Sequence, residues 1–88
     1  AQLDAHNCGS PLRHLEFEAD RCAFVLEYFA GLVTEMKGAS VPQGAGLLSF
    51  SVREPLGVVA RIAAFNHPLL FTVSKAAAVL AAGNAIVI

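Results

Sequence analysis

The residue with the clearest chemical potential is Asn66, within the segment Ala64-Phe65-Asn66-His67-Pro68. This segment separates an apolar run over residues 57–64 from an Ala-rich run that closes at Gly83. In open α/β sheets, ligands bind where a strand ends and a helix begins. An amide NH₂ at that place can donate a hydrogen bond to a carbonyl oxygen on which negative charge develops. An asparagine can also shape the loop before a helix, and spacing alone favours that structural role.

Four other side chains could take part in chemistry. Lys75 is the only charge between His67 and Ile88, so it must reach solvent, pair with a carboxylate or serve a site, and reaching solvent is the simplest of these. His67 has no visible partner acid or nucleophile, which favours a helix-start residue over a general base. Cys22 lies on an apolar stripe, where a buried thiol is inert, and Cys8 lies in a turn without a recognisable catalytic spacing.

The residues on either side of Asn66 predict a βαβ unit. Residues 58–64 show little alternation, which predicts a strand covered on both faces. Pro68 suits the first helical position, where its missing N–H costs nothing, and the helix would reach Ala82 before Gly83 stops it. A further apolar run over residues 84–88 predicts a second strand, parallel to the first.

An amphipathic helix is predicted for residues 15–37, after a turn cluster in residues 1–13. Its apolar stripe recurs at spacings of three and four residues: Cys22, Leu26, Phe29, Val33 and Met36. Gly38 fits the position just past the helix.

A turn region is expected from Gly38 to Gly46, followed by a single strand. Leu48, Phe50 and Val52 alternate with polar residues, which predicts a strand that is buried on one face. Pro55 ends this strand, because proline cannot donate to a sheet ladder.

The composition indicates part of a larger protein. The 88 residues are 56% hydrophobic and 15% charged, with a mean hydropathy of +0.59, which is apolar for an independent small domain. The chain starts at Ala1 and stops at Ile88 within a strand-like run. We therefore expect a fragment whose surface is covered by protein outside this sequence.

The charge and cysteine patterns argue against several classes of protein. A net charge of −1 without a basic patch argues against nucleic acid or an anionic membrane as partner. No disulfide framework, metal-ligand spacing or signal peptide is visible. The apolar, charge-free run of residues 76–88 is shorter than the roughly 20 residues that span a bilayer. A cytoplasmic location without a metal site is the expectation.

The chain resembles the aldehyde dehydrogenase family along essentially its whole length. The segment from Arg53 to Leu70 resembles the family pattern R-E-P-x-G-V-x-x-x-I-x-P-W-N-F-P-L, with departures at Ala64, Phe65 and His67. Lys75 and the run Leu80-Ala-Ala-Gly-Asn84 match the helix lysine and the A-L-A-A-G-N that follow in the family. Tyr28-Phe-Ala-Gly31 also fits the family's earlier helix.

The resemblance implies roles for individual residues. Asn66 would help to hold the oxyanion of a cysteine thiohemiacetal, and Lys75 would assist proton movement near the catalytic centre. A stretch of five residues would line the nicotinamide side of a cleft for NAD or NADP: Ile62, Ala63, Ala64, Phe65 and Asn66. The absence of a G-x-G-x-x-G fingerprint after the first strand agrees with the family's cofactor domain, which also lacks it.

The same resemblance implies an α/β fold in three parts. Residues 1–38 would be a turn plus the amphipathic helix of the cofactor domain, residues 39–55 an arm strand in oligomer contacts, and residues 56–88 a truncated parallel βαβ unit of a Rossmann-like cofactor domain. Ala64, Phe65 and His67 depart from the family's proline, tryptophan and phenylalanine, so the substrate preference can differ.

The expected parent protein is an NAD(P)-dependent aldehyde dehydrogenase that oxidises a small-molecule aldehyde to a carboxylic acid. We expect it to be a homo-oligomer, a dimer or a tetramer. The fragment alone would be inactive and prone to associate, because the family's cysteine nucleophile and glutamate base lie outside it and its strand edges are unpaired. The alternative is a non-catalytic relic or assembly module that keeps the oligomer-contact surface.

Overall fold

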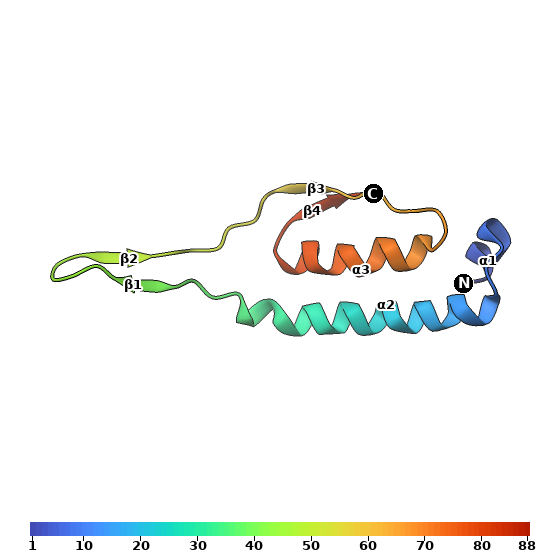
Figure 1. Ribbon diagram of the computed structural model, residues 1–88, viewed down its shortest axis with the longest axis horizontal. Helices are drawn as coiled ribbons and strands as arrows, with labels where there is room; N and C mark the ends of the chain where they lie inside the picture. Colours follow the sequence, from blue (N-terminus) through green and yellow to red (C-terminus); the bar gives the residue numbers. More distant parts are fainter.

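The computed structural model describes residues 1–88 and mixes helices with short strands. In chain order the elements are α1 (Gln2–Cys8), α2 (Leu12–Leu32), the 3₁₀ helix η1 (Val33–Glu35), β1 (Ser40–Pro42), β2 (Leu48–Phe50), β3 (Val58–Ala60), α3 (Pro68–Ala81) and β4 (Ala85–Val87). The molecule measures 65 × 22 × 14 Å, because a hairpin of β1 and β2 extends away from a body formed by the other elements (Figure 1). None of the helices combines the length and the hydropathy needed to cross a bilayer.

The body contains the parallel βαβ unit that the sequence predicts. β3 and β4 pair in parallel, with Val59 opposite Ile86, and α3 connects them. α3 lies between this two-stranded sheet and α2, so the body is layered as strands, α3 and α2 (Figure 1). The outer face of the sheet is not covered, and Val58 is exposed. The expectation of a strand buried on both faces is therefore wrong for this chain, because only α3 packs on it.

The ends of α3 follow the local signals closely. The helix begins at Pro68, with His67 at the N-cap position, and it ends at Ala81, one residue before the predicted end. Gly83 has a left-handed φ of 79°, which a glycine adopts without a steric cost. β3 ends at Ala60 rather than at the predicted position 64, because its pairing partner β4 ends at Val87.

The core lies where α3 packs on α2. Four apolar residues are buried: Leu15, Cys22, Ala76 and Ala77. The two alanines let the helix backbones approach closely, and Cys22 Sγ lies 3.9 Å from the carbonyl oxygen of Leu69. The part of the predicted stripe around Cys22 therefore faces α3, whereas Val33 and Met36 near its end remain exposed.

The N-terminal part differs from its prediction. Residues 2–8 form α1, where only a turn cluster was expected, and the turn signals are confined to the short joint between α1 and α2. Gly9 ends α1 with a φ of 75°, and its N–H donates to the carbonyl oxygen of Ala5. α2 begins at Leu12, three residues before the predicted start, and its last predicted turn tightens into η1.

The arm is a hairpin and not a single strand. β1 pairs with β2 in antiparallel, with Val41 opposite Ser49, within the stretch predicted as a turn region. The glycines and Pro42 of that stretch resemble a long turn in the sequence, although the turn itself occupies only its centre. Leu48 and Phe50 are exposed, so the predicted half-burial of this strand is wrong within this chain, because no element of the chain packs on the hairpin.

Asn84 ties the βαβ unit together. Its Oδ1 accepts a hydrogen bond of 2.9 Å from the N–H of Gly57, just before β3. Its Nδ2 donates to the carbonyl oxygens of Val79 and Ala82, at 3.3 and 3.4 Å, at the end of α3. The residue is buried, so water cannot replace these bonds if they are lost.

Replacing Asn84 by Ala is expected to lower the free energy of unfolding by about 1–3 kcal/mol, because the hydrogen bonds of a buried amide to Gly57, Val79 and Ala82 are lost. The measurement is denaturant unfolding of the natural full-length protein. The matched control is Asn7→Ala, since Asn7 is exposed on α1. Equal losses for the two variants would contradict the role given to Asn84.

Candidate functional site

The loop between β3 and α3 carries most of the residues that the sequence marks as functional. It covers residues 61–67 and leaves the sheet at the carboxyl end of β3. The Arg61 N–H donates to Val87 O at 2.8 Å, and the Arg61 Nε donates to Phe71 O at 3.3 Å. One residue thus fixes the start of the loop to both β4 and α3.

Asn66 lies in the turn directly before α3 and is exposed. No side-chain hydrogen bond within the chain involves its amide, and the first turn of α3 receives no side-chain cap. The capping role that an asparagine can play at a helix start is therefore not seen here. The amide remains free to donate to a group outside the chain.

The rest of the loop presents apolar surface. Ile62 is 91% exposed and Phe65 is 86% exposed, while Ala63 is half-buried and Ala64 is exposed. A large aliphatic and an aromatic side chain exposed on one short loop form a surface that a flat, partly apolar molecule could cover.

Lys75 lies on α3 and is exposed, without an ion pair to any carboxylate of the chain. It borders a groove of about 430 Å³ between α2 and α3, together with Arg21, Phe71 and Ser74. Asn66 does not line this groove. The structure therefore leaves Lys75 reaching solvent and does not bring it together with Asn66.

His67 has a partner acid that the sequence did not reveal. Its Nδ1 lies 2.5 Å from Oε1 of Glu18, which comes from α2. The expectation that His67 begins a helix is confirmed, but the expectation that it lacks a partner acid is wrong. The sequence held part of the information needed to predict this contact. Glu18 lies four residues before Cys22, so both side chains lie on the same face of the helix.

The Glu18–His67 contact is unusual in its burial. Glu18 is only 7% exposed, whereas the neighbouring Glu16 and Asp20 are exposed on the same helix. The contact is not aligned as a hydrogen bond, and Glu18 Oε2 and His67 Nδ1 are both shielded from solvent without a hydrogen-bond partner. A buried carboxylate needs a compensating group, and His67 is the one that the fold supplies.

Cys22 is the buried thiol that the sequence predicts. Burial raises its pKa, and the negative charge of Glu18, one helical turn away, raises it further. Because the thiolate is the nucleophilic form, a raised pKa makes this cysteine less reactive at a given pH. Cys8 is half-buried and not paired with Cys22.

We expect iodoacetamide to alkylate Cys22 more slowly than Cys8. The alkylation rate at Cys22 should rise only at a pH above the ordinary pKa of a cysteine thiol. The raised pKa keeps the thiol protonated as the pH increases, which fixes the direction of the effect. Peptide mass spectrometry of the folded protein at several pH values measures both sites at once. Equal rates at neutral pH would show that Cys22 is neither buried nor shifted.

Comparison with known proteins gives the family. The model of the aldehyde dehydrogenase family matches residues 1–88, and the chain therefore belongs to this family. Among curated relatives, an aldehyde dehydrogenase of Talaromyces stipitatus, tropH, is 40% identical over 91 residues. The match covers 100% of this chain and 18% of that relative, so the chain spans under a fifth of its length. No solved structure matches the chain.

Proposed function

We propose that the chain is the part of an NAD(P)-dependent aldehyde dehydrogenase that supplies Asn66 to the oxyanion site. The observation that carries the proposal is the free amide of Asn66 at the carboxyl end of β3, in a chain that the family model matches throughout. The overall reaction converts an aldehyde, NAD(P)⁺ and water into a carboxylic acid, NAD(P)H and a proton.

The loop residues fit one end of the cofactor better than the other. Ile62 and Phe65 offer exposed apolar surface beside Asn66, which suits a nicotinamide ring. The start of α3 has Pro68 in place of an N–H donor, and no glycine-rich turn precedes it, so it does not suit the pyrophosphate. Ile62, Ala63, Ala64, Phe65 and Asn66 would thus line the nicotinamide side of the site. NAD(P)⁺ supplies the acceptor for the hydride of the substrate.

Asn66 acts on the reacting carbonyl group in this proposal. A cysteine thiolate, supplied by protein outside this chain, adds to the aldehyde carbon, and the carbonyl oxygen gains negative charge. The amide NH₂ of Asn66 donates to that oxygen and stabilises the charge as it forms. β3 and α3 anchor the two ends of the loop, so that Asn66 is presented beside the carboxyl end of the strand.

Replacing Asn66 by Ala in the full-length enzyme is expected to lower kcat by about 100- to 1,000-fold, the usual effect of removing one oxyanion donor. The Kd for NAD(P)⁺, measured by fluorescence titration, should change far less. Asn7→Ala is the matched control, because it removes an exposed amide from α1. Near-normal turnover of the Asn66→Ala variant would refute the oxyanion role.

The hairpin is proposed to serve as an arm that binds a second copy of the parent protein. Its exposed apolar side chains include Val41, Leu48 and Phe50, and no other part of the chain packs on them. Exposed apolar residues gathered on one extended hairpin are typical of a surface that another protein covers. The free edges of β1 and β2 also leave backbone groups available for pairing.

The substitution Phe50→Glu is expected to shift the full-length protein toward smaller species, because a charge would then enter the proposed apolar contact. Size-exclusion chromatography with light scattering measures the change. Gln43→Glu is the control, since it adds the same charge at an exposed polar position of the hairpin. An unchanged mass for Phe50→Glu would argue against an arm that holds the oligomer together.

A further inference from the structure

The starting point is the exposed side of the His67 ring. The His67 side chain is 36% exposed, but its Nδ1 faces Glu18 and is shielded from solvent. The exposed part of the ring is therefore the opposite side, which carries Nε2. The negative charge of Glu18 lies beside Nδ1 and favours the neutral tautomer with the proton on that nitrogen, although the two atoms do not form an aligned hydrogen bond. Nε2 of this tautomer is a hydrogen-bond acceptor.

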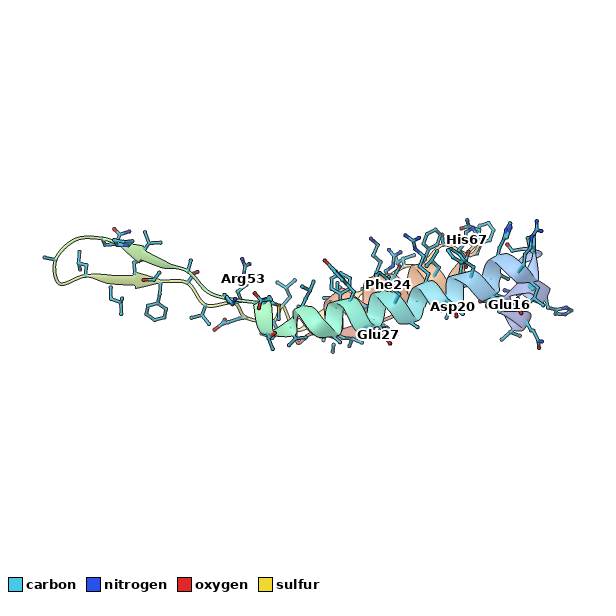
Figure 2. All side chains as sticks on the ribbon, turned by 90° about the horizontal axis from the view of Figure 1, so that it is seen from below. Glu16, Asp20, Phe24, Glu27, Arg53 and His67 are labelled. Carbon is cyan, nitrogen blue, oxygen red and sulfur yellow. The ribbon has the colours of Figure 1, made fainter.

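The exposed side of His67 borders a groove. The groove has a volume of about 410 Å³ and is lined by His14, Phe17, Glu18, Arg21, His67 and Leu70. Figure 2 shows His67 at the end of α3 that lies beside the N-terminal half of α2. The groove therefore reaches the residue that follows Asn66 directly in the chain, and consecutive Cα atoms are only about 3.8 Å apart.

Glu18 distinguishes this groove from an ordinary surface hollow. Glu18 is only 7% exposed, and its Oε2 has no hydrogen-bond partner. Burying a carboxylate in this way costs free energy, so a fold keeps such a residue only where another interaction offsets the cost. The compensation here is the contact with His67, which also restricts how the imidazole ring can turn. The edge-to-face packing of His67 on Phe71, with ring centroids 5.8 Å apart, restricts it further.

We propose that Glu18 and His67 act as a pair that selects the substrate, and that the selected class is aldehydes bearing a hydroxyl group near the carbonyl. Glu18 is the positioning residue, and His67 Nε2 accepts a hydrogen bond from the substrate hydroxyl. The proposal rests on the proposed function, because it needs the aldehyde carbon to react beside Asn66. It deepens that function by naming a substrate class.

A hydroxyl group suits this site better than an anionic group does. Arg21 lines the groove and could attract a carboxylate, but it is exposed to solvent, which weakens such an attraction. The buried negative charge of Glu18 opposes an anion at the same place. A hydroxyl group is neutral, so it can donate to Nε2 of His67 without being repelled by Glu18 and without needing the weak attraction of Arg21.

The test compares two aldehydes of nearly equal shape with the full-length enzyme at pH 8. 3-Hydroxypropanal carries a hydroxyl where butanal carries a methyl group, and kcat/KM is measured for each. The wild-type enzyme should favour 3-hydroxypropanal. A wild-type preference for butanal, or for the anionic 4-oxobutanoate over both, overturns the proposal, and this comparison decides it even where a variant does not fold.

Two variants then test whether Glu18 and His67 cause the preference for 3-hydroxypropanal over butanal. The double substitution Glu18→Leu and His67→Phe removes both partners together, so that no lone charge is buried, and it should lower the ratio of the two kcat/KM values by about 3- to 10-fold, the range for one hydrogen bond. Glu16→Gln should leave the ratio unchanged, because Glu16 is exposed on the same helix. An unchanged ratio in the double variant overturns the proposal.

Failure of this proposal can be told from failure of the proposed function. If the wild-type enzyme oxidises neither of these two aldehydes, the selection falls, and the proposed function falls with it only if a panel of other aldehydes is not oxidised either. If it oxidises both equally well, and Asn66→Ala lowers both rates, the proposed function stands while the selection by Glu18 and His67 is refuted.

Discussion

The hydrogen bonds of one buried amide hold the βαβ unit together. Asn84 joins the backbone just before β3 to the end of α3, so the first strand, the helix and the second strand meet at a single side chain. Beyond this closed end, β3 and β4 pair in parallel, and the opposite end of the unit presents residues 61–67. Asn66 lies on the loop at that opposite end.

The elements around this loop could be predicted because their signals are local. Pro68 and Gly83 mark the two ends of α3 to within a residue, and two apolar runs mark β3 and β4. α1 and β1 could not be predicted in the same way, because their segments contain turn residues. β1 exists only through its pairing with β2, and such a pairing is not visible in either strand alone.

The candidate site could also be predicted only where its signals are local in the sequence. Asn66 stands out in the sequence as a polar residue between an apolar run and a proline-started helix. The contact of Glu18 with His67 does not, since it joins residues that are far apart in the chain and arises only when α2 packs on α3. The burial of Cys22 followed from helical periodicity, whereas the charge beside it became clear only from the structure.

The burial of Glu18 also constrains how this sequence can change over time. An exchange of His67 for an apolar ring, made first, leaves a carboxylate in the interior without its partner, and an exchange of Glu18 made first leaves the imidazole without the group that orients it. The two positions are therefore epistatic, and the effect of a change at one depends on what occupies the other. Evolutionary paths through this region of the chain should favour paired replacements, although the two residues are encoded far apart.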